Sequence, residues 1–395
     1  MSVFKDIRVL ELGRVFSGPL CSMVLADIGA RVIKVERPGT GDESRHFGQQ
    51  DEAGQSAYFN SLNRKKKSIC LDLKNPEDKK TLLSLVAKSD VLVHNWIQAS
   101  LDRLGFSYKE IKRINPRLIY CSISGYGYNS PFADQPSQDI IAQAISGFLS
   151  LTGEADGPPM RTGIPVVDYA TGLYAAFAIM AALYEREKTG KGQLLHTSLL
   201  ETALAMTSFS AASYLATGEN PQRSGNRHPS ICPYNIYRTR DGLITVAVAN
   251  DKMWERFCSC LGLDQLRDDP AYKTNELRLK NQDALELELE ARMKMDKTEK
   301  ILQLLKEAKV SCSRVNSLDQ AFSSEEVRAL DIFLPKGSKH DMIAGRLGKK
   351  QAMGTRTRLV GPPFHMDCMD QLEEDNAPRL GQHSQMIRKW LEEST

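Results

Sequence analysis

Ile7-Arg8-Val9-Leu10-Glu11-Leu12-Gly13 begins the stretch that decides the fold, because a helix pattern from Pro19 to Ile28 and a second apolar run, Arg31 to Glu36, follow it. The first run is typical of a buried strand that ends at Gly13, and Gly29 closes the helix before the second strand. Two strands with one helix between them predict a right-handed β-α-β crossover and parallel pairing.

The same alternation continues along the first part of the chain. Further strands are predicted at 68–73, 90–94 and 118–123, with a helix at 76–88. The predicted fold class is therefore α/β, with a doubly wound, mostly parallel, Rossmann-like sheet. Ligands of such sheets bind beyond the carboxyl ends of the strands. The candidate functional residues at these ends are Arg14, Phe16, Arg37, Asn95 and Ser124-Gly125.

At 395 residues the chain is too long for one ordinary core, so two domains are expected. We predict a large α/β domain over 1–217, a linker poor in apolar residues over 218–233, and a small α+β domain over 234–329. The small domain begins with a strand unit that turns at Asp241-Gly242, and helices follow it. Residues 330–395 are strand-like and turn-rich, end in a short helix, and return to complete the large domain.

Composition narrows the function classes. Apolar residues make up 41% of the chain and the net charge is +3, which implies no general affinity for nucleic acid or acidic membranes. No apolar run approaches the length of a transmembrane span. The eight cysteines form no C-x-x-C pair and the seven histidines are dispersed, so free thiols and no metal are expected. The first residues carry no secretory or transit pattern, so a cytoplasmic protein is expected.

Three common chemistries lack their sequence signatures. The first strand-to-helix turn, Gly13-Arg14-Val15-Phe16-Ser17-Gly18, has no middle glycine to admit a pyrophosphate, which disfavours a dinucleotide cofactor. No G-x-x-x-x-G-K-[ST] phosphate loop occurs. Cys121-Ser122-Ile123-Ser124-Gly125 is not a G-x-S-x-G nucleophile elbow, because it begins with cysteine. No permanently bound cofactor is predicted.

One acid stands apart from the rest. In Pro165-Val166-Val167-Asp168-Tyr169-Ala170-Thr171-Gly172, Asp168 ends a short apolar run, and a helix pattern over 173–187 follows. An aspartate at a helix start is commonly an N-cap that accepts the free N–H groups of the first turn. The alternative is a carboxylate nucleophile, since the small residues around it let a ligand approach closely. The residues of this stretch leave both interpretations open.

The basic run Asn63-Arg64-Lys65-Lys66-Lys67 also has two interpretations. A solvated loop is the simpler one. The other is a patch for a phosphorylated ligand such as the 3′-phospho-ADP end of coenzyme A. The second interpretation gains support from four further cations predicted near the same sheet edge, Arg14, Arg37, Lys74 and Arg103.

Taken together, these segments resemble the family III coenzyme A transferases, the CaiB/BaiF family, over essentially the whole chain. The matching segments include Val15-Phe16-Ser17-Gly18-Pro19, the Asp168 stretch, and residues 25–38, 41–45, 63–69, 89–95, 104–106, 115–120, 124–127, 181–186, 189–193 and 380–383. The resemblance implies an interlocked homodimer that acts on an acyl-CoA and a free carboxylic acid.

By this resemblance Asp168 is the catalytic aspartate, and the implied mechanism is covalent. The carboxylate attacks the donor thioester and forms an aspartyl mixed anhydride while CoA thiolate leaves. The thiolate then attacks the anhydride, which yields an aspartyl-CoA thioester and frees the donor acid. The acceptor carboxylate repeats these steps in reverse. Backbone N–H groups near the helix start would stabilise the oxyanions.

The resemblance also assigns binding positions. Those matching the family's CoA contacts are Arg14, Val15, Phe16, Arg37, Leu71, Lys74, Asn95, Trp96 and Arg103. Two departures from formyl-CoA transferase, Phe16 in place of a polar Gln and 227–231 in place of a glycine-rich loop, argue against formyl-CoA and oxalate. Similarity to dicarboxylate-handling members favours succinyl-CoA as donor and a short dicarboxylate as acceptor. The candidate substrate contacts are Gln138, Arg161, Arg227 and His228.

Two rival functions remain. The α-methylacyl-CoA racemases share the fold but use a histidine directly before the acid that matches Asp139, and Gln138 stands there in this chain. An amide cannot act as the proton-transfer base. The other rival is a CoA-binding homologue without catalysis, although nothing in the Asp168 stretch indicates a lost nucleophile.

Overall fold

The computed structural model describes residues 3–50, 54–330, 332–333, 359–367 and 376–393. The chain divides into two compact units. The first comprises residues 1–148, 162–212 and 330–395, and the second comprises residues 149–161 and 213–329.

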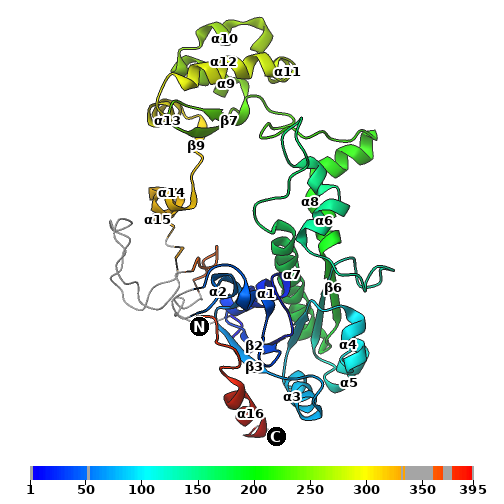
Figure 1. The fold of residues 1–395 in the computed structure, drawn as a ribbon. Helices are drawn as coiled ribbons and strands as arrows, with labels where there is room; N and C mark the ends of the chain where they lie inside the picture. The colour runs from blue at the N-terminus through cyan, green and yellow to red at the C-terminus, as the bar shows by residue number, and fades with distance from the viewer. Residues whose placement is uncertain (1–2, 51–53, 331, 334–358, 368–375, 394–395) are drawn as a thin grey trace. The chain divides into compact units, whose positions relative to one another are not determined.

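A six-stranded parallel sheet forms the centre of the first unit (Figure 1). Its strand order is β3-β2-β1-β4-β5-β6, so the chain winds outward in one direction from β1 and in the other from β4. The strands are β1 (Arg8–Glu11), β2 (Arg31–Glu36), β3 (Lys66–Cys70), β4 (Val91–His94), β5 (Ile119–Ser124) and β6 (Leu194–Ser198).

Helices cover both faces of this sheet because its strands are apolar on both sides. Val9, Val93 and Cys121 pack on one face with α1 and α7, whereas Leu10, Leu92 and Tyr120 pack on the other. The helices of the unit are α1 (Ser17–Asp27), α2 (Ala57–Asn63), α3 (Pro76–Ala87), α4 (Gln98–Leu104), α5 (Tyr108–Ile114), α6 (Asp139–Ile145), α7 (Val166–Thr189), most of α8 (Leu199–Thr217) and α16 (Ser384–Glu393).

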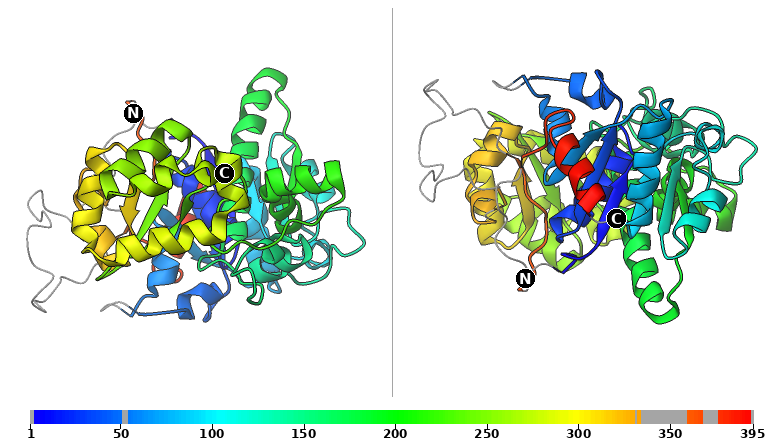
Figure 2. Two further views of the ribbon diagram at one scale, coloured as in Figure 1. Left: turned by 90° about the horizontal axis from the view of Figure 1, so that it is seen from above. Right: turned by 90° about the horizontal axis from the view of Figure 1, so that it is seen from below.

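The C-terminal segment returns to the first unit. Ile387 and Leu391 of α16 are buried in the same core cluster as Leu82 of α3, and Figure 2 shows this helix lying against the sheet. The backbone N–H of His383 donates to Ser68 O at 2.9 Å, so the segment is also bonded to β3.

The second unit has a three-stranded antiparallel sheet, β7 (Tyr234–Arg238), β8 (Leu243–Ala247) and β9 (Ser311–Arg314), in that order. Its core contains Trp254, Phe257, Leu289 and Ile301. Its helices are α9 (Asp251–Leu261), α10 (Asp264–Asp268), α11 (Asn275–Lys280), α12 (Gln282–Lys294), α13 (Thr298–Glu307), α14 (Leu318–Ser323) and α15 (Glu325–Arg328).

The predicted fold class is confirmed, with a doubly wound parallel sheet and a smaller α+β unit. The second unit differs from the predicted range 234–329, because it also contains 149–161 and starts at 213. Arg223 explains the difference, since its guanidinium donates to Glu154 O and Gly157 O at 3.3 and 2.7 Å. Most of the strand-like pattern predicted beyond 330 lies outside the described residues.

Helix α7 contradicts one sequence-based expectation. By length and composition alone it is apolar enough to cross a membrane, whereas no such segment was expected. Its Ala175, Ala176, Ile179 and Ala182 are buried with the sheet in the core of the first unit. A long, apolar helix with one face in a protein core has this composition for packing reasons.

Candidate active site

The strand order of the first unit reverses between β1 and β4, and in such sheets the ligand site lies beyond the strand ends at this point. Two predicted residues meet there. The Asn95 side chain, just after β4, accepts from Arg14 N and donates to Arg14 O, both at 2.8 Å. The Arg14 guanidinium lies 5.6 Å from the centre of the Trp96 ring. The structure therefore brings Arg14, Asn95 and Trp96 together.

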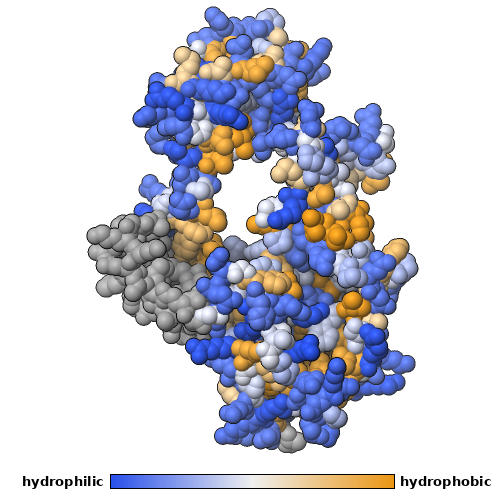
Figure 3. Space-filling view, viewed as in Figure 1, coloured by the Kyte–Doolittle hydropathy of each residue, from blue (hydrophilic) through white to orange (hydrophobic). Residues whose placement is uncertain are grey.

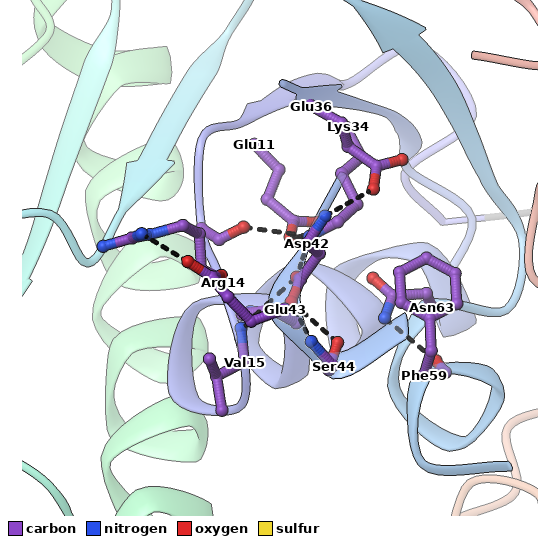
Figure 4. A network of polar contacts seen from close by, with 12 residues as sticks. Glu11, Arg14, Val15, Lys34, Glu36, Asp42, Glu43, Ser44, Phe59 and Asn63 are labelled. Carbon is purple, nitrogen blue, oxygen red and sulfur yellow. Dashed lines mark hydrogen bonds and ion pairs between the residues drawn. The ribbon is translucent and has the colours of Figure 1, made fainter. Parts of the chain in front are cut away.

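A buried cluster of charges lies next to the loop between β1 and α1. Its members are Glu11, Lys34, Asp42 and Lys66, and Figure 4 shows part of it. Lys34 Nζ is 2.7 Å from Glu11 and 2.8 Å from Asp42, and Lys66 Nζ is 2.8 Å from Glu11. These two cations and two anions neutralise one another. Burial raises the pKa of Asp42, but Lys34 and Ser44 outweigh it and lower the value to about 2. Burial, with help from Lys34, lowers the pKa of Lys66 to about 8.

Asp168 lies in the first turn of α7, so the sequence-based N-cap interpretation is wrong. The helix starts at Val166, and the side chain that caps its first turn comes from α6. Asp139 Oδ1 accepts from Val167 N and Asp168 N at 2.8 and 3.0 Å. These two N–H groups are therefore occupied. They are not available to an oxyanion, contrary to the prediction for N–H groups near this helix start.

The Asp168 carboxylate is partly buried next to a second acid. Burial and then the charge of Asp139 raise its pKa to about 7, against a smaller opposing effect of a Ser17 hydrogen bond. Among the described residues no cation lies within ion-pair distance of Asp168. Such an acid is costly for the fold and is typical of a functional carboxylate.

Aromatic side chains surround this region. The Phe16 ring centre lies 6.1 Å from those of Tyr58 and Tyr169, and the Phe47 ring lies 5.7 Å from Tyr58. Burial, followed by the charges of Asp168, Asp42 and Asp139, raises the pKa of Tyr58 to about 12. The Tyr58 hydroxyl therefore stays protonated and can donate a hydrogen bond near Asp168.

Close helix packing fixes where Asp168 sits. A Cβ added to Gly172, one turn further along α7, would lie 2.8 Å from Ser17 O and 3.0 Å from a Leu20 methyl. Only glycine allows α7 to approach the first turn of α1 this closely. The approach sets the Ser17 hydroxyl beside Asp168.

The other predicted CoA positions of the first unit divide into two groups. All four predicted cations are exposed: Arg14, Arg37 and Lys74 lie in the loops after strands, and Arg103 lies in the last turn of α4. Arg14 is also paired with Glu43 at 2.7 Å. The Leu71 side chain is buried in the core, so only its backbone can meet a ligand.

The basic run 63–67 fits neither of its two interpretations. Arg64 is buried and ion-paired with Asp27, to which its Nε donates at 3.0 Å. Lys66 is buried in the charge cluster, whereas Lys67 is exposed. Alternation along β3 therefore sends part of the run into the core, where each charge has an acidic partner.

The predicted substrate contacts do not all belong to the same unit. Gln138 is exposed and directly precedes α6 in the first unit, whereas Arg161, Arg227 and His228 belong to the second. Arg227 is paired with Asp283 and Glu286, both at 2.7 Å. Its guanidinium is therefore occupied in this structure. His228 Nδ1 accepts from Ser230 N at 3.1 Å.

Sequence reasoning missed Asp139, Tyr58 and Ser17 as parts of this site. Asp139 was noted only as the residue after Gln138, and its role in capping α7 carries no local sequence signal, since it starts α6. Within the described residues no group of three or more potential metal ligands occurs.

The fold and this site define a class of protein: a doubly wound α/β protein with a partly buried acid of raised pKa near the carboxyl ends of its strands. Comparison with known proteins gives the family. Residues 4–384 match CoA-transferase family III, and the chain belongs to this family.

Its relatives support the same assignment. The chain is 38% identical to succinyl-CoA:glutarate CoA-transferase of Mus musculus, over 98% of this chain and 86% of that protein. It is 37% identical to acetyl-CoA:oxalate CoA-transferase of Acetobacter aceti, over 98% and 95%. A crystal structure of a CaiB/BaiF family protein from Brucella suis is 33% identical, with a TM-score of 0.87 and 99% of each chain covered. The predicted family and the CoA-transferase activity are thus confirmed, and CoA thioesters are its substrates.

Proposed function

We propose that the protein transfers CoA between carboxylic acids through covalent intermediates on Asp168. The observation that carries this proposal is the placement of Asp168, a partly buried acid without an ion-pair partner among the described residues, beside the N-terminus of α1 and the ligand edge of the sheet. A carboxylate held away from water and beside Asp139 is destabilised as an anion, and attack on a thioester removes its charge.

The covalent sequence balances at each step. The Asp168 carboxylate attacks the thioester carbonyl, the C–S bond breaks, and an aspartyl anhydride and CoA thiolate result. The thiolate attacks the aspartyl carbonyl and expels the donor acid, which leaves an aspartyl-CoA thioester. The acceptor acid reverses both steps. No resident cofactor enters, because every bond change occurs at a carboxylate, thioester or thiolate.

A test of this mechanism traps the intermediate. Wild-type protein is incubated with succinyl-CoA and then with hydroxylamine or borohydride, digested, and analysed by mass. We expect a changed mass on the peptide that contains Asp168. Modification at another residue, or none at all while exchange proceeds, would contradict the proposal. Solvent deuterium appearing at the α-carbon of a branched acyl-CoA would instead favour a racemase.

We further propose succinyl-CoA as the donor and a short dicarboxylate as the acceptor. The relatives support this choice, since the names of two pair CoA donors with glutarate and oxalate, which are both dicarboxylates. The two names carry different donors, so the test is a panel of acyl-CoA donors crossed with mono- and dicarboxylic acids. Turnover confined to monocarboxylic acceptors would exclude the proposed class.

We also propose that the protein works as a homodimer. The support is an exposed apolar surface on α6, α7 and α8, which Figure 3 shows over α6 and α8. A surface this apolar is rare on a monomer. Its side chains include Ile140, Ile145, Leu173, Phe177, Leu204 and Phe209. A monomeric mass in light scattering at micromolar concentration would rule the dimer out.

A further inference from the structure

The loop between β1 and α1 holds a strained residue. Val15 has φ of 65°, a left-handed conformation that β-branched residues rarely adopt. Phe16 N donates to Arg14 O at 2.9 Å, so a three-residue turn closes around Val15. A strained backbone of this kind persists only where the surroundings enforce it, and it is commonly found at functional sites.

Three side chains hold three successive residues of this loop. Lys34 Nζ donates to Gly13 O at 2.9 Å. Asn95 bonds both polar atoms of the Arg14 backbone. Asp42 accepts from Val15 N at 3.1 Å. The loop is therefore clamped along its length rather than only at its ends.

Asp42 is the part of this clamp that acts on the strained residue itself. Its carboxylate also receives Ser44 N and Ser44 Oγ, at 2.9 and 2.7 Å, and pairs with Lys34 at 2.8 Å (Figure 4). Lys34 is in turn fixed by Glu11. With all these groups buried, the carboxylate has no freedom to follow Val15 if the loop relaxes.

The loop leads directly to the reacting group. Phe16 and Ser17 follow Val15; the Phe16 ring lies 6.1 Å from that of Tyr169, and the Ser17 side chain lies close enough to Asp168 to lower its pKa. Gly172 lets α7 pack directly against Ser17 O, so Asp168 and the start of α1 lie close together. Relaxation of Val15 would thus displace the groups that surround Asp168.

We propose that Asp42 is a positioning residue for the nucleophile: it holds Val15 in its left-handed turn and so fixes Phe16 and Ser17 against Asp168. This inference rests on the proposed function of Asp168. Displacement of a reacting group by about 1 Å costs on the order of 100-fold in rate. Asp42 contacts no reacting atom; it acts on the surroundings of Asp168 through this loop, and its charge also acts on Tyr58.

The test compares two buried aspartates of the first unit. Asp42→Asn removes a charge that holds the loop between β1 and α1. The control, Asp27→Asn, removes a similarly buried charge that pairs with Arg64 and, within the described part of the chain, makes no bond to this loop. For each protein kcat is measured at saturating acyl-CoA and divided by the fraction of molecules that bind acyl-CoA in an equilibrium titration. We expect this corrected kcat to fall about 100-fold in Asp42→Asn with little change in KM, and to stay within threefold of wild type in Asp27→Asn.

A second substitution tests the role of Val15. Glycine adopts positive φ without a steric penalty. Val15→Gly in the Asp42→Asn background is therefore expected to recover about tenfold in corrected kcat. A further loss instead of recovery would contradict the inference.

Asn95→Ser keeps the inference testable if Asp42→Asn does not fold, because Asn95 is only partly buried. It removes both bonds to Arg14 and is expected to lower the corrected kcat about tenfold at saturating acyl-CoA. A corrected kcat at the wild-type value in Asp42→Asn, or in Asn95→Ser if Asp42→Asn is insoluble, would overturn this inference. It would leave the proposed function of Asp168 standing. An adduct missing from wild type would overturn the proposed function on which it rests.

Discussion

Asp42 and Asp168 are two acids of the same unit whose surroundings shift their pKa values in opposite directions. Burial raises the pKa of both carboxyl groups. At Asp42 the Lys34 ammonium and the Ser44 donors reverse this effect, whereas at Asp168 a second acid, Asp139, adds to it. The first acid is thus compensated, and the second is kept in a state that favours loss of its charge. The contrast is that expected between a carboxylate that stabilises the fold, Asp42, and the proposed nucleophile, Asp168.

The largest effect that follows from this contrast is on catalysis. Asp168→Asn removes the nucleophile while preserving its shape, so we expect CoA exchange to fall on the order of 10⁴-fold or more. Binding of acyl-CoA is expected to survive, since the exposed cations at the strand ends are unchanged. Initial rates and equilibrium binding of a CoA thioester measure the two properties separately. Exchange at the wild-type rate would mean that Asp168 is not the acylated residue.

The next effect is on stability. Asp42→Asn leaves the cluster with one uncompensated buried cation, which typically costs about 3–5 kcal/mol. Because the folded pKa of Asp42, about 2, lies below the unfolded value of 3.8, its contribution is present above about pH 4 and is lost as the pH falls toward 2. Urea unfolding of wild type and variant at pH 7 and pH 3 measures the difference. A difference that does not shrink at pH 3 would show that the charge is not its cause.

The same substitution at Asp168 should have the opposite sign. Its folded pKa, about 7, lies above the unfolded value of 3.8, so the wild-type fold loses stability as the pH rises between them. Asp168→Asn is therefore expected to stabilise the protein by about 1–2 kcal/mol at pH 8, after allowance for its partial exposure, and by little at pH 4. Urea unfolding at the two pH values tests this. Destabilisation at pH 8 would remove the basis of the comparison.

Much of the fold could be predicted from the sequence, and the reason is local. Strands such as Val91–His94 are buried on both faces, so they appear as continuous apolar runs. Strand β6 (Leu194–Ser198) was missed because this edge strand is only partly buried and contains His196, so its apolar signal is weak.

The electrostatics of the site could not be predicted, because it depends on pairs that are distant in the sequence. Asp139 caps the helix of Asp168 from 29 residues away, and no local pattern links the two. Lys34 and Lys66 look like solvated charges until Glu11 and Asp42 are placed next to them. The sequence thus singled out Asp168 as a candidate, and its catalytic role stays a prediction, whereas the expectation that it caps a helix was wrong.

The smallest of the expected effects refines the role of Asp139. In the proposed mechanism the carboxylate form of Asp168 is the nucleophile, so the single-turnover rate of CoA release should rise with pH through a midpoint near pH 7. Asp139→Asn keeps an oxygen that can accept from Val167 N and Asp168 N but removes the neighbouring charge. Since that charge raises the pKa of Asp168, the midpoint of the profile should move down by about one pH unit. Rapid-mixing measurements between pH 5 and 9 determine the midpoint. An unchanged midpoint would assign the raised pKa to burial alone, and would limit Asp139 to capping α7.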